Sequence, residues 1–432
     1  MKRRFLFAAI SCAVVMSVSA AAVTAGAVSV ADKSSDAVVD LQNSELVSVS
    51  NDYSYALEED GTVHITYYKG SSTDVEVPET LDGKKVTSLD NGVFAYSKTL
   101  TSVTIPEGVT DIGSGTFRSC ANLKKVVLPK SVTAVTDSMF YGCSALTDVQ
   151  LGSDTTSIGT YAFYSCESLK TLNLGDKVTS IGNSAFSHTN SLESLTIPHS
   201  VTKLGEYVFA WSSVKEVRIL GSVETIETFA FHDAAQLQKV ELPDTLKTIK
   251  KSAFWGCSAL SEINLPDSIT TIEDNAFWEC ESLTEVYIPR YMTTISEGTF
   301  CGCSKLSKVV IPAGVTEIKG IIPFYRCPDL SIYGFSGSAA EAYANKNYIK
   351  FVPISAIIYG DSLFYGNVDG DDSVSSSDAL LILRESVGLE AFSSEQRKYA
   401  DVNLDNSVDS ADSLAVLRYS VGYTDNGVKI GK

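Results

Sequence analysis

The chain has 432 residues, of which 44% are hydrophobic and 20% are charged, enough for one long folded domain and a small second one. Acidic residues outnumber basic residues by 52 to 34, giving a formal net charge of −18. Such a charge excludes nucleic acid as an expected partner, because its phosphates would be repelled.

Residues 1–27 have the composition of a secretory signal peptide. Three basic residues precede the apolar run Phe5–Val18, and residues 25–27 offer an A-x-A cleavage site, although cleavage after Ala20 or Ala22 also fits. The apolar run is too short for a stable transmembrane anchor. We therefore expect an exported protein, found extracellularly or at a cell surface, in which residues 28–52 form a flexible tether.

A hairpin is expected over residues 53–85, followed by a solenoid over residues 86–354. The solenoid is indicated by a period of 23 residues, with coils that bury a continuous core only when stacked. One column of the repeat is Phe94, Phe117, Phe140, Phe163, Phe186, Phe209, Phe231, Phe254, Phe277 and Phe300. A second is Leu100, Leu123, Leu146, Leu169, Leu192, Val214, Leu237, Leu260, Leu283 and Leu306. A short helix and a final strand are expected to cap it over residues 338–354.

These repeats resemble the BspA-like leucine-rich-repeat family of bacterial surface proteins. The signature of that family is close to I-P-x-x-V-T-x-I-G-x-x-A-F-x-x-C-x-x-L, and residues 109–131 read VTDIGSGTFRSCANLKKVVLPKS. The resemblance implies a mainly β, α+β chain with a leucine-rich-repeat solenoid of about ten 23-residue coils plus caps. It also implies adhesion or the binding of a protein or glycan, without a shared catalytic site.

Nine cysteines occur, one of them in the signal peptide. Seven stand three residues after a column Phe or its equivalent, a spacing that favours free thiols in a buried column, although a bridge between adjacent coils is geometrically feasible. The seven are Cys120, Cys143, Cys166, Cys257, Cys280, Cys303 and Cys327. Cys301 lies outside the column and is the candidate for reactivity or for pairing with Cys303.

No catalytic motif interrupts the repeats, and the four histidines are not spaced as metal ligands, so we expect no enzyme. Two surfaces remain as candidates for ligand binding. One carries aromatic residues directly after the column Phe, namely Tyr141, Tyr164, Trp255 and Trp278, which would either bind a ligand or shield the Phe column from water. The other is an outward strand column, formed by Val127, Gln150, Asn173, Thr196, Arg218, Glu241, Asn264, Tyr287 and Val310.

After a linker at residues 355–364, a pattern of twelve residues rich in oxygen donors occurs twice. Loop positions 1, 3, 5, 7, 9 and 12 match those that supply six to eight oxygens to calcium at about 2.3–2.6 Å. The expected ligands of the first ion are Asn367, Asp369, Asp371, the Ser373 carbonyl, Ser375 and Asp378. Those of the second ion are Asp401, Asn403, Asp405, the Ser407 carbonyl, Asp409 and Asp412.

The two loops differ in charge. Asn367 is neutral at position 1, so the second loop has four carboxylates against three, and we expect it to bind its ion more tightly. An acidic solvated loop is the alternative, but it does not account for two matches in register. A helix with Leu and Arg at matching positions follows each loop, and no amphipathic helix is expected before either loop.

This loop-helix duplicate resembles type I dockerin modules, over residues 365–425, with residues 426–432 as a tail. The resemblance implies two calcium ions and a cohesin domain of a scaffoldin as partner. The positions that would contact the cohesin are Ser376, Ser377, Leu383, Arg384, Ser410, Ala411, Leu417 and Arg418. The leucines would alternatively form the core of the module itself, and the pairing of Ser377 with Ala411 leaves open whether both faces bind the same cohesin.

The sequence thus predicts a secreted, non-catalytic binding or adhesion protein, anchored by calcium-dependent docking in a cellulosome-type or cell-surface assembly. One alternative is an accessory component of polysaccharide degradation, associated with glycoside hydrolases. Another is an adhesin whose C-terminal module binds a partner other than a cohesin. The ligand of the solenoid is not specified by any of these patterns.

Overall fold

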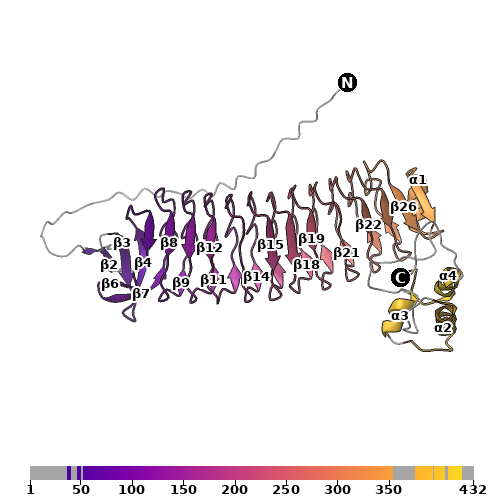
Figure 1. The fold of residues 1–432 in the computed structure, drawn as a ribbon, viewed down its shortest axis with the longest axis horizontal. Coiled ribbons are helices and arrows are strands. Elements are labelled where there is room, and N and C mark those ends of the chain that lie inside the picture. Colours follow the sequence, from indigo (N-terminus) through magenta and orange to yellow (C-terminus); the bar gives the residue numbers. More distant parts are fainter. Residues whose placement is uncertain are drawn as a thin grey trace, which may run out of the picture.

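The structure is a computed structural model that describes residues 37–39, 46–49, 52–353, 375–392, 394–403 and 407–420. A long solenoid of stacked coils runs from the N-terminal strands to a unit of three helices near the C-terminus (Figure 1). The predicted signal peptide and the linker at residues 355–364 lie outside the described residues. So do residues 367–374, which are most of the first predicted calcium loop.

The N-terminal end of the solenoid is an antiparallel sheet in the order β1-β2-β3-β4. β3 (Tyr53–Leu57) and β4 (Val63–Tyr68) form a hairpin, and β4 pairs in parallel with β7 (Lys84–Leu89), which also pairs with β6 (Thr80–Leu81). β1 (Ala37–Val39) and β2 (Leu46–Val49) extend this sheet within the expected tether. Their β-branched valines favour a strand once an edge is available.

The coils pair through two parallel ladders. Each strand pairs with its counterpart one repeat away, so that Val126 lies between Val103 and Val149. The longer strands are β5 (Asp74–Glu76), β8 (Ser102–Thr104), β10 (Lys125–Val127), β12 (Asp148–Gln150), β15 (Ser194–Ile197), β17 (Glu216–Ile219), β19 (Lys239–Glu241), β22 (Glu285–Tyr287), β24 (Lys308–Val310), β26 (Ser331–Gly334) and β27 (Lys350–Pro353). The two-residue strands of the other ladder are β9 (Asp111–Ile112), β11 (Ala134–Val135), β13 (Ser157–Ile158), β14 (Ser180–Ile181), β16 (Lys203–Leu204), β18 (Thr225–Ile226), β20 (Thr248–Ile249), β21 (Thr271–Ile272), β23 (Thr294–Ile295) and β25 (Glu317–Ile318).

The core is one continuous cluster in which the two predicted columns are fully buried. Consecutive rings of the Phe column stack with centroids 4.9–5.7 Å apart, from Phe94 to Phe324. A one-residue deletion shortens the repeat between Phe209 and Phe231, yet Leu195 still pairs with Val217 in register. Each coil therefore contacts its neighbours only, as expected for a solenoid.

The cysteine column forms a regular chain of hydrogen bonds. Each of the seven column thiols donates to the carbonyl oxygen of the column Phe one coil earlier, at 3.0–3.2 Å. All eight cysteines of the described chain are free. The expected pairing of Cys301 with Cys303 is wrong, because the Cys303 thiol bonds to Phe277 instead. Burial also raises the pKa of Cys301 to about 11, which disfavours a reactive thiolate.

Helix α1 (Ala339–Lys346) closes the C-terminal end of the solenoid. The Ser338 hydroxyl caps it by accepting from the Glu341 backbone N–H, as Ser does at many helix starts. The ring of Tyr343 then packs against Phe324, the last ring of the stack, at 5.8 Å. The helix thereby covers apolar side chains that the next coil would otherwise bury.

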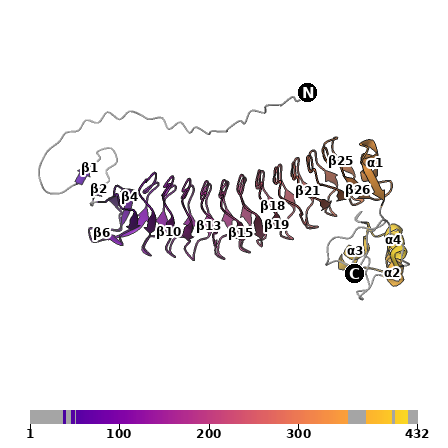
Figure 2. The same ribbon diagram turned by 45° about the horizontal axis from the view of Figure 1, so that its top comes forward.

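The C-terminal unit consists of α2 (Ser376–Ser386), α3 (Ser394–Ala400) and α4 (Ser410–Ser420), which lie together in Figure 2. α2 and α4 pack on each other and bury Ile382 and Val416. α3 directly precedes Asp401, so a helix does precede the second loop, where the expectation was that no amphipathic helix precedes either loop. Three of its seven residues are charged, and it is too short for a clear apolar period. None of the described helices is long and apolar enough to cross a membrane.

Candidate calcium and docking site

The second predicted calcium loop is held closed by its last carboxylate. Asp412 Oδ1 accepts hydrogen bonds from the backbone N–H groups of Val402 and Asn403, at 2.9 and 3.2 Å. Its Oδ2 accepts from the Asp409 backbone N–H at 2.9 Å, within the first turn of α4. Because one side chain joins positions 2, 3, 9 and 12, the loop folds back on itself as an ion-binding loop does.

The first loop ends in the same way. The Ser375 backbone N–H donates to Asp378 Oδ2 at 2.8 Å, and the Ser377 N–H donates to Ser375 Oγ at 3.1 Å. Positions 9 and 12 of each loop are thus the N-cap and the third helical residue, which is the spacing of a capping box. The two repeats therefore share a local structure as well as a sequence pattern.

The donor chemistry of the second loop fits a hard divalent cation. Its described ligand positions Asp401, Asn403, Ser407, Asp409 and Asp412 all carry oxygen atoms of the kind that calcium prefers. Within the described residues no three acidic, His or Cys side chains converge as a metal site. The remaining expected carboxylates Asp369, Asp371 and Asp405 lie outside those residues, as do the Asn367 and Ser373 positions.

The leucines expected to contact a cohesin lie on the surface of the helices. Leu383 in α2 and Leu417 in α4 are 41% and 43% exposed, whereas their neighbours Ile382 and Val416 are fully buried. Leu380 and Leu414 extend the same exposed stripe by one turn. Of the two interpretations open from the sequence, the structure excludes burial of these leucines in the core of the unit.

The other residues expected to contact a cohesin are exposed as well. Ser376, Ser377, Ser410 and Ala411 form the first turns of the two helices, beside the stripe. Arg384 pairs with Glu390 at 3.3 Å. In the sequence the position equivalent to Glu390 in the second repeat is Thr424, which lies outside the described residues.

Other residues of the helical unit rest on the solenoid. Val310 joins a buried cluster with Ile382, Phe392, Val402 and Val416, and Tyr287 and Tyr333 pack against it. These three solenoid residues are neighbours on the outward strand column. The C-terminal end of that column is thus already covered, while Gln150, Arg218 and Glu241 are exposed.

The aromatic residues outside the Phe column form one continuous stripe. Tyr141 stacks on Tyr164 at 4.8 Å, and Trp255 stacks on Trp278 at 5.2 Å. Between these pairs the stripe continues through His188, Trp211 and His232, with centroids 5.0–5.7 Å apart. Sequence reasoning missed His188 and Trp211, which stand two residues after the column Phe; aromatic spacing across both positions would have revealed them.

Neighbouring rings of this stripe cover one another. The Tyr141–Tyr164, His188–Trp211 and Trp255–Trp278 pairs are stacked at 6–25° from parallel, whereas the other three contacts are edge to face. Burial lowers the pKa of both His188 and His232, which favours neutral imidazoles within the stripe. Aromatic platforms for sugars need accessible ring faces, and this arrangement favours shielding of the core.

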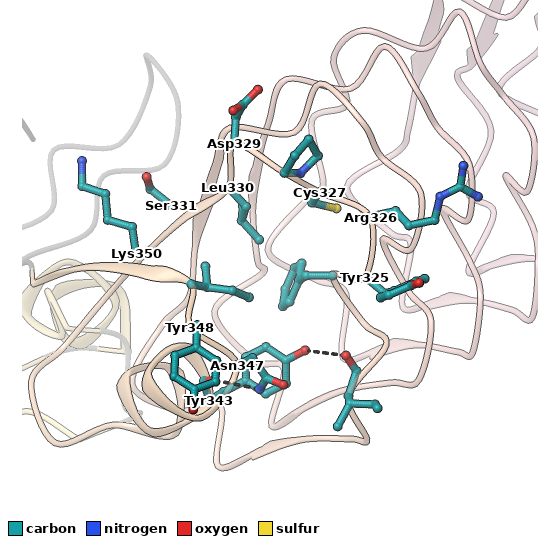
Figure 3. A pocket seen from close by; sticks show the side chains of 14 residues that line it. Tyr325, Arg326, Cys327, Asp329, Leu330, Ser331, Tyr343, Asn347, Tyr348 and Lys350 are labelled. Atoms are coloured by element: carbon teal, nitrogen blue, oxygen red, sulfur yellow. Dashed lines mark hydrogen bonds between the residues drawn. The ribbon is translucent and has the colours of Figure 1, made fainter. Parts of the chain in front are cut away.

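A hollow of about 680 Å³ lies at the C-terminal cap, between α1 and the last coil. Tyr325, Tyr343 and Tyr348 line it, and the Tyr343 hydroxyl donates to the Ile321 carbonyl oxygen at 3.3 Å. Figure 3 shows Arg326 and Lys350 on opposite sides of this hollow, pointing away from each other. The charged groups therefore do not converge on a common point.

Two protein-family models match the chain, one over the solenoid and one over the C-terminal unit. The model of the BspA type leucine rich repeat region matches residues 87–215 and 202–331, which together are more than half of the chain. The model of the Dockerin type I domain matches residues 365–419. No curated protein matches the chain.

Solved structures of bacterial leucine-rich-repeat proteins are also similar. A leucine rich cell surface protein from Faecalibacterium prausnitzii A2-165 is 28% identical, with 69% of this chain and 97% of that chain covered and a TM-score of 0.41. A leucine-rich repeat protein from Bacteroides ovatus ATCC 8483 is 23% identical, with 71% and 99% covered and a TM-score of 0.39.

Proposed function

This chain belongs to the BspA type leucine rich repeat family, and from that premise we propose a secreted binding protein that is anchored through its C-terminal dockerin. Leucine-rich repeats and dockerins are non-catalytic modules, and both are typical of extracellular or cell-surface proteins. A dockerin implies a cohesin partner. The finer statement is that two calcium ions hold the dockerin in the form that docks onto a scaffoldin.

The exposed stripe of Leu380, Leu383, Leu414 and Leu417 is the observation that carries this proposal. These leucines are exposed at equivalent places on two packed helices, so they do not contribute to the core of the unit. An apolar centre with a charged rim is the usual composition of a protein interface. Arg384 and Arg418 would supply that rim. None of these leucines belongs to the buried cluster at Val310, so docking and the contact with the solenoid use different residues of the dockerin.

The solenoid would then present its ligand-binding surface at a distance from the anchor. The uncovered part of the outward strand column carries mixed charge, with Arg218 donating to Glu241 at 2.7 Å. Mixed polarity suits a protein ligand better than a polymer of one charge. We propose this face, rather than the aromatic stripe, as the surface that binds the solenoid ligand.

Docking is tested with immobilised recombinant cohesins and the full chain, with calcium and with a chelator. We expect Leu383→Ala together with Leu417→Ala to weaken binding at least a hundredfold, since buried apolar anchors each contribute about 1.4 kcal/mol or more. Leu57→Ala, an exposed leucine of the N-terminal cap, is the matched control and should bind like the unsubstituted protein. Undiminished binding by the double variant, or in chelator, would refute the proposal.

A further inference from the structure

A buried ion pair connects the solenoid to the second calcium loop. Arg290 Nη2 donates to Asp401 Oδ2 at 3.0 Å, and the two side chains are only 2% and 4% exposed. Arg290 follows β22 in the solenoid, and Asp401 is position 1 of the loop. Because the ion pair is buried, salt screens it little, and the positive charge of Arg290 strongly affects the electrostatic potential at the loop.

The surroundings keep this pair in place. The backbone N–H of Ala313 in the solenoid donates to the Asn403 carbonyl oxygen at 3.4 Å, two residues beyond Asp401. The Arg290 guanidinium lies 5.0 Å from the ring centre of Tyr291. Together with the apolar cluster around Val310, these contacts seat the start of the second loop directly on the solenoid.

The ion pair changes the charge balance between the two loops. By sequence the second loop has four carboxylates and the first has three. One guanidinium bound to Asp401 reduces the net charge of the second loop from −4 to −3, which equals that of the first. The stronger calcium binding expected for the second loop is therefore a property of the loop alone and is lost when the dockerin is seated.

We propose that Arg290 and calcium compete for Asp401, so that calcium binding at the second loop and seating of the dockerin on the solenoid oppose each other. Two cations that share one buried carboxylate repel each other across it. A coupling of this kind is reciprocal: the seated dockerin binds calcium less tightly at the second loop, and calcium there loosens the seat. This inference rests on the calcium binding proposed above.

We expect this competition to change the contact between the dockerin and the solenoid. The exposure of the docking residues should stay the same. Leu383 and Leu417 are exposed in the seated arrangement, so a cohesin would reach them in either state. With calcium at the first loop and none at the second, the dockerin is folded and seated on the solenoid. With calcium at both loops, the dockerin becomes a hinge about which the solenoid can turn.

The test uses the full chain with both loops intact, in which calorimetry with calcium is analysed for two separate sites. We expect Arg290→Gln, which keeps a donor but removes the charge, to tighten calcium binding at the second loop at least fivefold and to leave the first loop unchanged. Arg290→Lys keeps the charge and should bind like its parent. Arg218→Gln, which removes an exposed arginine distant from the dockerin, is the matched control.

A second variant guards against misfolding of Arg290→Gln. Val310→Ser weakens the apolar seat without touching the ion pair, and should also tighten calcium binding while increasing the maximum dimension seen by small-angle scattering. Equal or weaker calcium binding by both variants, with the parent binding calcium normally, overturns the competition but leaves calcium-dependent docking intact. Absence of calcium binding in the unsubstituted chain overturns both the competition and the proposed calcium-dependent docking.

Discussion

The Ser413 hydroxyl in α4 donates a hydrogen bond of 2.7 Å to the carbonyl oxygen of Ala379 in α2. The two residues occupy equivalent positions of the duplicate, thirty-four residues apart, and both are buried. Ala379 has no side-chain hydroxyl, so it cannot donate the equivalent hydrogen bond from α2 to α4. The internal twofold of the dockerin is thus broken at the point where its two halves meet.

Replacement of Ser413 should weaken the contact between the two halves. We expect Ser413→Ala to lower the free energy of unfolding of the dockerin by about 1 kcal/mol, the usual net worth of a buried neutral hydrogen bond. Denaturant unfolding followed by helical circular dichroism measures this. Ser420→Ala is the control, because its exposed hydroxyl bonds only to Leu417 within the same helix. An equal loss in both variants would contradict the role of the interhelical bond.

Calcium removal should melt the dockerin and spare the solenoid. The dockerin core is small and three of its seven buried residues are alanine, namely Ala379, Ala400 and Ala415, so we expect it to bury too little apolar surface to stay folded without its ions. We expect a chelator to remove most of the helical circular dichroism and to leave the β signal unchanged. Loss of the β signal on chelation would count against this division into two independently stabilised units.

Alkaline pH should destabilise the solenoid through its cysteine column. Burial raises the pKa of Cys120 to about 11 and that of Cys327 to about 12, from an ordinary 9.0. Below pH 9 these thiols are protonated in both states; above it they ionise only in the unfolded chain, which favours unfolding. We expect the free energy of unfolding to fall as pH rises from 9 to 11, by up to about 1.4 kcal/mol per pH unit for each thiol.

Urea unfolding at pH 8 and at about pH 10 measures the effect of these thiols. A variant with Cys120→Ala and Cys327→Ala is the control: it is less stable overall but should lose less stability between the two pH values. The same loss in both proteins would assign the alkaline sensitivity to groups other than these two thiols.

Replacement of the tryptophan pair distinguishes the two interpretations of the aromatic stripe. Because Trp255 and Trp278 stack on each other, we expect Trp255→Ala with Trp278→Ala to destabilise the solenoid by about 1–3 kcal/mol. Binding to plant-wall polysaccharides and secreted proteins should stay unchanged, as measured by a solid-phase screen. A ligand whose binding disappears in a folded double variant would restore these residues as a binding site.

The solenoid was predictable because each coil repeats the same pattern of apolar residues. The columns of Phe94, Leu100 and Cys120 could be read from spacing alone, and all three are buried as expected. The family comparisons confirm the leucine-rich-repeat and dockerin identifications, while the domain boundaries and the cohesin face stay predictions.

Features that depend on distant contacts were not predictable. Arg290 and Asp401 are 111 residues apart, and neither belongs to a pattern that points to the other. α3 is stabilised from outside its own sequence, since Arg397 pairs with the buried Glu385 of α2. The stacking within the aromatic stripe depends on turn geometry two residues after each Phe, where Trp211 adopts a positive φ of 56°.

The regular spacing of the Phe stack also means that the length of the solenoid depends directly on the number of coils. Each coil adds about 5 Å and touches only its neighbours, so a coil can be gained or lost while the cap at β3 and the seat at Val310 stay as they are. The deletion between Phe209 and Phe231 shows that even an imperfect copy is tolerated. The number of coils therefore sets the distance between the N-terminal cap and the dockerin, and duplication of a short genetic segment is enough to change that distance.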